Sequence, residues 1–191
     1  MEDKKIDLKD PMVWIDLEMT GLTPENNQII EIAVIVTDAN DLETRYEGPN
    51  LIINCPQEIL DGMDDWCTKH HGESGLTQSV IDSKITLADA EKQVIDFLQN
   101  TCNIKPRTAP FAGNSISTDR MFLYKEMKDL FNFLHYRIID VSTMKQLCNW
   151  WYPEDFSKVP AKKECHRAKD DIIESIEELK YYQQAIMKSK A

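Results

Sequence analysis

The sequence is poor in basic residues, in glycine and in long apolar runs. It has 22 Lys and Arg against 33 Asp and Glu, a formal charge of −11, whereas proteins that hold long nucleic acids usually carry a basic face. Only 6 glycines and 8 prolines occur in 191 residues, which excludes a collagen-like or low-complexity chain. Its apolar runs, such as Ile32–Val36, fall far short of the roughly 20 residues that span a membrane.

Cysteine patterns for metal binding or disulfide bonding are also missing. The chain has 5 cysteines and no C-x-x-C pair, which argues against a disulfide framework and against a zinc knuckle. The N-terminal sequence MEDKKIDLKD resembles neither a secretory signal nor an Arg-rich transit peptide. We therefore expect reduced thiols and a cytoplasmic protein, or a mitochondrial one if a presequence is missing from this chain.

What is present is the composition of a folded domain. The apolar fraction of 42% is close to the globular average, and the length suits one domain with a buried core. We expect a flexible N-terminal tail over 1–10 and a single domain over 11–191.

The hydrophobic pattern predicts an α/β fold. Strands over 12–18, 28–37 and 44–54, separated by short turns, indicate an antiparallel or mixed opening to a sheet. Short strands and amphipathic helices then alternate, with helices over 57–70, 86–102, 115–133, 142–152 and 166–188, and strands over 109–112 and 137–140. This order predicts a mixed central sheet flanked by helices.

Two carboxylates stand at the end of the first predicted strand. Asp16 and Glu18 are two residues apart and so point to one face. Trp14 shares that face and Ile15 lies on the other, which indicates a central strand, and α/β proteins bind ligands at the carboxyl ends of such strands. Paired carboxylates repel unless a cation lies between them, and Mg²⁺ and Mn²⁺ prefer oxygen ligands. The alternative is the charged face of an exposed edge strand.

Further acidic and basic candidates occur later in the chain. Asp119 falls in the first turns of a predicted helix, where it either serves a site or complements the helix dipole. His166 near its ordinary pKa of about 6.5 suits a general base. Within a helix, Asp170 would be the nearest acid to His166, whereas Asp171 faces the site if His166 precedes the helix. Spacing leaves both open.

These residues together indicate one chemistry. Three or more carboxylates from separate elements can hold two divalent ions about 4 Å apart, a pair that stabilises the attacking and leaving oxygens of phosphodiester hydrolysis. A histidine would take the proton from the attacking water.

The combined motifs resemble the DEDDh 3′→5′ exonuclease superfamily, and within it the oligoribonucleases. The resemblance covers about residues 12–188 and rests on Asp16-Leu17-Glu18-Met19-Thr20-Gly21-Leu22, Gly113-Asn114-Ser115, Asp119 and His166-x-x-x-x-Asp171. It implies an RNase H-like (exonuclease) fold. It also implies removal of nucleoside 5′-monophosphates from the 3′ end of very short RNAs, dinucleotides above all and up to about five nucleotides, by two-metal hydrolysis.

The resemblance assigns the catalytic and metal-binding roles. Asp16, Glu18 and Asp171 would bind the first Mg²⁺ or Mn²⁺, which selects Asp171 over Asp170. Asp16 with Asp119, directly or through water, would support the second ion. His166 would be the general base.

The resemblance also assigns substrate contacts and a homodimer. Leu22 and Trp66 would contact the bases, because an aromatic face stacks on any base. Polar contacts would close around the terminal 5′-phosphate from the same chain and, through two residues, from the other subunit: His71, Ser115 and Ser142, then Tyr136 and Arg137. A capped 5′ end selects substrate length, because a longer chain has nowhere to continue.

Two other functions compete with this prediction. An exonuclease for long tails or DNA ends would want an extended basic surface, which the composition does not show. A non-catalytic module on the same fold would have no reason to retain mutually repelling carboxylates. The acidic composition therefore argues against long nucleic acid rather than against nucleic acid altogether.

Overall fold

A five-stranded mixed sheet forms the centre of the computed structural model, which describes residues 6, 8–161 and 167–188. The strand order is β3-β2-β1-β4-β5. Three strands form an antiparallel meander, namely β1 (Pro11–Met19), β2 (Ile29–Asp38) and β3 (Asp41–Ile52). β4 (Pro110–Gly113) and β5 (His135–Asp140) run parallel to β1. The predicted α/β class and the mixed sheet are confirmed.

The chain between β3 and β4 forms more helices than the sequence predicted. The single helix expected over 57–70 is two, α1 (Gln57–Asp61) and α2 (Asp65–Glu73), followed by α3 (Leu76–Asp82). Gly62 ends α1, and the Asp64 carboxylate caps α2 by accepting a 2.8 Å hydrogen bond from the Cys67 N–H. Leu60 of α1 and Leu76 and Val80 of α3 pack together in one small core beside β2.

The remaining helices are close to their predicted positions, with shorter segments. Thr86 caps α4 (Leu87–Asp96) as expected, and a π-helical turn, η1 (Phe97–Thr101), continues it. The helix expected over 115–133 breaks at Met127, and the loop expected after 152 begins with one helical turn. The elements there are α5 (Ser117–Glu126), α6 (Lys128–Phe133), α7 (Val141–Trp151), α8 (Pro153–Phe156) and α9 (Ala168–Ala185).

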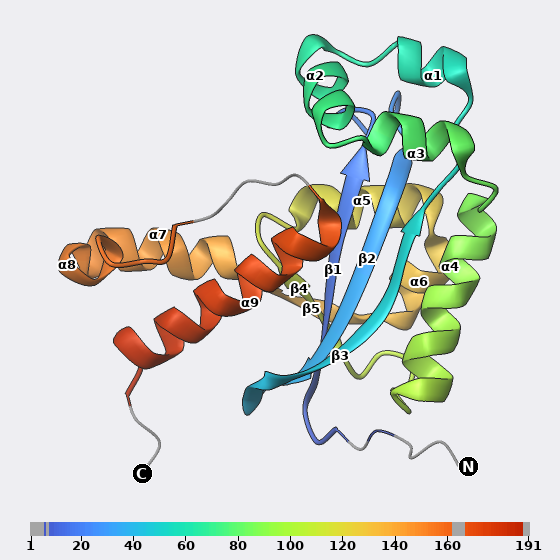
Figure 1. Cartoon of the computed structure of the whole chain (residues 1–191). Helices are drawn as coiled ribbons and strands as arrows, with labels where there is room; N and C mark the ends of the chain where they lie inside the picture. Colours follow the sequence, from blue (N-terminus) through green and yellow to red (C-terminus); the bar gives the residue numbers. More distant parts are fainter. Residues whose placement is uncertain (1–5, 7, 162–166, 189–191) are drawn as a thin grey trace.

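Helices cover both faces of the sheet. α4, α5 and α6 pack on one face against Val13, Ile15 and Leu17 of β1. α9 crosses the other face, as Figure 1 shows, and with α7 it covers Trp14. The Trp14 Nε1–H donates a 2.9 Å hydrogen bond to Thr37 on β2. β1 is thus buried on both sides, as its sequence predicted.

Parts of two predictions lie outside the described residues. The N-terminal tail over 1–10 is described only in part, and His166 belongs to the undescribed segment 162–166. Among the helices that are described, none is both long and apolar enough to cross a membrane.

Candidate metal centre and substrate pocket

β1 places Asp16 and Glu18 on the face that α9 covers. Both residues are largely buried, with the Glu18 side chain 12% exposed, and Trp14, two residues before Asp16, is fully buried beneath α9. The strand alternation therefore puts a hydrophobic anchor and two carboxylates in one row, with the carboxylates nearest the end of the strand.

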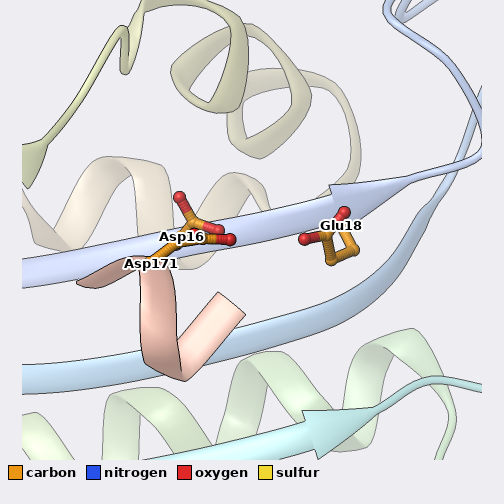
Figure 2. A group of neighbouring side chains, drawn as sticks. All are labelled: Asp16, Glu18 and Asp171. Carbon is orange, nitrogen blue, oxygen red and sulfur yellow. The ribbon is translucent and has the colours of Figure 1, made fainter. Parts of the chain in front are cut away.

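The first turns of α9 bring Asp171 to this row. Carboxylate oxygens of Asp16, Glu18 and Asp171 all lie within 4.8 Å of one another, and Figure 2 shows the helix carrying Asp171 beside the strand that carries the other two. Asp170 is exposed. Of the two acids that spacing alone left open, Asp171 is the one that joins the cluster.

Asp119 approaches from the opposite side of β1. It lies in the first turn of α5 and is only 8% exposed. Its Oδ1 accepts a 3.1 Å hydrogen bond from the Leu17 N–H, beyond the last residue of β1 that pairs with β4. Because β4 is short, Asp119 reaches the backbone of β1 between Asp16 and Glu18.

The electrostatics of the cluster are unfavourable for a chain without cations. Burial raises the pKa of Asp16 well above its ordinary value, and the charges of Asp119, Glu18 and Asp171 raise it further. Burial and Asp171 raise the pKa of Glu18 to about 8. Burial raises the pKa of Asp119 to about 7, against the hydrogen bond from Leu17. Such a set of buried carboxylates fits divalent cations, which remove the repulsion.

An ion pair beside the cluster was not assigned from the sequence. Glu31 on β2 is 0% exposed, lies opposite Glu18 in the strand register, and accepts two hydrogen bonds of 3.1 Å from the Arg167 guanidinium. The sequence signal for this pair is a single acid in an otherwise apolar strand, a pattern that fits either a paired buried acid or a site residue. The structure shows the buried pair.

Two predicted phosphate contacts meet at the carboxyl ends of β4 and β5. The Ser115 and Ser142 hydroxyl oxygens are 2.9 Å apart. The Ser115 N–H donates to both the Asp140 carboxylate and the Ser142 hydroxyl, at 3.0 and 2.7 Å. Asp140 also accepts the Ser142 N–H at 2.9 Å, so Asp140, not Ser142, caps α7. A polar cavity of about 290 Å³ adjoins the two serines and is lined also by Lys145 and Gln146.

Asn114 connects these serines to α9. Its Oδ1 accepts from the Ser142 hydroxyl at 3.2 Å, and its Nδ2 donates to Ser175 and Glu178 at 2.8 and 3.1 Å. The Ser175 hydroxyl donates to the Asp171 carbonyl at 2.8 Å. Glu178 is 2% exposed, although the acidic sequence around it, with Glu174 and Glu177, indicates a solvated helix face, and that interpretation is wrong for Glu178. The hydrogen-bond network joins the serine pair to the helix that carries Asp171.

The other predicted substrate residues differ in exposure: Leu22 and Trp66 are exposed, whereas His71 is buried. Leu22 and Trp66 are 75% and 52% exposed, and the Trp66 ring stacks on His70 at 4.0 Å between centroids. His71 is buried; its Nε2–H donates to the Met19 carbonyl at 2.9 Å, and its Nδ1 is 3.9 Å from Glu18.

Tyr136 and Arg137 lie on β5, an edge strand of the sheet. Both are exposed, and the Arg137 guanidinium lies 5.2 Å from the centroid of the Tyr136 ring. This placement suits side chains that contact another molecule, and their role in a partner's pocket stays a prediction.

Comparison with known proteins shows which family the chain is similar to. Residues 13–179 match the exonuclease family RNase_T. The chain is 53% identical over 179 residues to mouse "Oligoribonuclease, mitochondrial", covering 94% of this chain and 74% of the relative. It is 52% identical over 173 residues to oligoribonuclease from Hydrogenovibrio crunogenus, covering 91% and 92%.

A solved structure shows the same fold. It is described as Exonuclease I from Methylocaldum szegediense, and it superposes with a TM-score of 0.67 at 17% identity, covering 92% of this chain and 41% of that one. The predicted RNase H-like exonuclease fold is thereby confirmed. With the family match and the relatives, these similarities establish that the chain belongs to the oligoribonuclease family of exonucleases.

Proposed function

We propose that this chain hydrolyses very short RNAs from the 3′ end and releases nucleoside 5′-monophosphates. The observation that carries the proposal is the convergence of Asp16, Glu18 and Asp171 within 4.8 Å, with Asp119 held against the backbone between the first two. The relatives named oligoribonuclease support the substrate class.

The carboxylates are suited to two divalent ions, Mg²⁺ or Mn²⁺. Asp16, Glu18 and Asp171 would hold one ion, and Asp16 with Asp119 would support the other. Bound there, the ions would stabilise the charge that develops on the attacking and leaving oxygens. His166, which directly precedes Arg167 in the sequence, is the residue that we assign as general base, on the resemblance to the family.

Length selection would come from the serine pair and from a second subunit. Ser115 and Ser142 present hydroxyls at a polar cavity that is open to solvent, where the terminal 5′-phosphate would bind, and His71 would support the pocket from beside Glu18. Exposed Leu22 and Trp66 would hold the bases. Tyr136 and Arg137 of the partner in a homodimer would complete the phosphate cap.

We propose a cytoplasmic or mitochondrial location for the enzyme. The name of the mouse relative supports the mitochondrion, and the cysteine pattern supports a reducing compartment. Microscopy of the tagged full-length protein tests this.

A labelled RNA ladder tests the function directly. With 5′-labelled RNAs of about two to about twenty nucleotides, we expect rapid cleavage of the dinucleotide and slow cleavage of the longest RNAs, whose backbones an acidic protein binds weakly. Chelator should abolish both. Equal rates across the ladder would contradict length selection, and activity that survives chelation would contradict the metal assignment.

Replacing Ser142 with alanine should weaken the preference for short, 5′-phosphorylated RNA. When substrate binds, the hydroxyl would turn from the Asn114 Oδ1 and donate its one hydrogen to the charged phosphate instead. Hydrogen bonds to charged groups contribute about 1.5–3 kcal/mol, so we expect KM for pGpG to rise roughly tenfold to hundredfold with a smaller change in kcat. Ser157→Ala is the matched control, because the Ser157 hydroxyl donates to the Glu154 carbonyl in α8, away from the serine pair. An unchanged KM in Ser142→Ala would remove Ser142 from the cap.

A further inference from the structure

The ion pair between Arg167 and Glu31 joins two elements next to the carboxylate cluster. Nε and one terminal nitrogen of Arg167 each donate to a different oxygen of Glu31, both at 3.1 Å. Two parallel bonds fix the plane of the guanidinium as well as its distance. Glu31 pairs with Glu18 of β1 near one end of that ladder and with Ile52 of β3 on its other side, so its position is set by the sheet.

The backbone of Arg167 forms the start of α9, so fixing Arg167 also fixes the start of that helix. Arg167 is the residue that precedes the first turn of α9. Its carbonyl oxygen accepts the N–H groups of Asp170 and Asp171, at 2.9 and 3.1 Å. The side chain of Arg167 therefore attaches to the sheet, while its backbone starts the helical turn that aims Asp171.

The pair also settles which acids are available to a cation. Glu31 lies directly opposite Glu18, and it is fully buried. Both carboxylate oxygens of Glu31 accept hydrogen bonds from Arg167, so the guanidinium charge balances the charge of Glu31. Glu18 and Asp171, by contrast, keep oxygens close to Asp16.

We propose that Arg167 and Glu31 form a positioning clamp that docks the start of α9 on β2 and so sets Asp171 at coordinating distance from Asp16 and Glu18. The clamp rests on the proposed metal site. Neither residue contacts substrate in this proposal; both act through Asp171 and Glu18. Partners that orient the ligands of a metal site typically change metal affinity or activity by about 10–100-fold when they are replaced.

Removing the two charges together tests the clamp. Single removal would leave a buried charge without its partner and would threaten folding, whereas apolar residues of similar volume often replace a buried pair without loss of stability. Arg167→Met/Glu31→Met leaves the net charge unchanged. We expect Mn²⁺ binding, measured by calorimetry on the folded protein, to weaken about tenfold or more, and kcat for pGpG to fall by a similar factor with little change in KM.

The matched control is a second pair between α9 and the sheet. Lys169 Nζ lies 2.7 Å from Glu47 on β3, and both side chains are exposed. Lys169→Met/Glu47→Met should keep native Mn²⁺ affinity and kcat. Native values in Arg167→Met/Glu31→Met, or equal losses in the control, would overturn the clamp.

A conservative variant keeps the test informative if the double variant does not fold. Arg167→Lys retains the charge but cannot form the two parallel bonds. We expect its Mn²⁺ affinity to be weakened, although less than in the double variant, and an unchanged affinity would overturn the clamp. Mn²⁺ binding needs no RNA, so a wild-type protein that binds Mn²⁺ but spares pGpG would refute the proposed function separately.

Discussion

Replacing Asp16 with asparagine is expected to abolish hydrolysis of pGpG while leaving the fold intact. The charges of Asp119, Glu18 and Asp171 all raise the pKa of Asp16, and Asp16 is the residue that we assign to both ions. Metal ions stabilise the charge in such transition states by several kcal/mol. A loss of about 4 kcal/mol corresponds to roughly a thousandfold in kcat.

Asp16→Asn should lose activity but should not lose stability. Asparagine is close in shape to aspartate and removes one member of a repelling cluster, so the melting temperature without metal should equal or exceed that of the wild type. Asp170→Asn is the matched control, since Asp170 is exposed on the same turn as Asp171 and should keep full activity. Turnover of pGpG at the wild-type rate by folded Asp16→Asn would refute the metal assignment.

The central part of the site was predictable because strand alternation is a local rule. Apolar residues on both sides of Asp16 indicated a central strand, and the spacing to Glu18 put both acids on one face. The assignment of Asp119 and the choice of Asp171 over Asp170 needed the resemblance, since each depends on how an element far along the chain docks on β1. Side-chain contacts across 102 residues, such as that between Leu17 and Asp119, have no signature in local periodicity.

The features that the sequence missed are polar contacts between elements. Glu178 follows the acidic pattern of an exposed helix face, yet Asn114 and Tyr182 bind its carboxylate in the interior, with Tyr182 donating at 2.9 Å. Asp140 rather than Ser142 caps α7, because the helix begins at Val141, directly after the strand. The hydrogen-bond partners of Glu178 and Asp140 come from other elements of the fold, and the spacing of hydrophobic residues does not predict which elements meet.

The network around Asn114 gives the two halves of the site a physical connection. It runs from the Ser142 hydroxyl through Asn114 to Ser175, whose hydroxyl donates to the carbonyl of Asp171. The arginine clamp holds the same helix from its other side. In the function that we propose, the site measures a short substrate between a phosphate cap and a metal pair, and it would need these two parts at a fixed separation. The acidic surface would cost such a site little, because the substrate has almost no backbone to hold.

Stability without metal should fall as the pH rises, and divalent cations should remove that loss. A carboxyl group with a higher pKa in the folded chain than in the unfolded chain binds its proton more tightly when folded, so raising the pH between the two values destabilises the fold. For Glu18 this interval runs from 4.5 to about 8, and for Asp119 from 3.8 to about 7. We expect a loss on the order of a few kcal/mol between about pH 5 and pH 8.

Thermal melting with and without Mg²⁺ measures this effect. For a chain of this size, such a loss corresponds to a fall in melting temperature on the order of 10 °C without metal. Added Mg²⁺ should raise the melting temperature more at about pH 8 than at about pH 5, because the raised pKa values of Glu18 and Asp119 leave these two carboxyl groups largely protonated at the lower pH. Asp16→Asn/Glu18→Gln separates the cluster from the general repulsion of an acidic protein: its pH slope should be much flatter and its response to Mg²⁺ lost. A wild-type slope in that variant would mean that the pH dependence arises elsewhere in the chain.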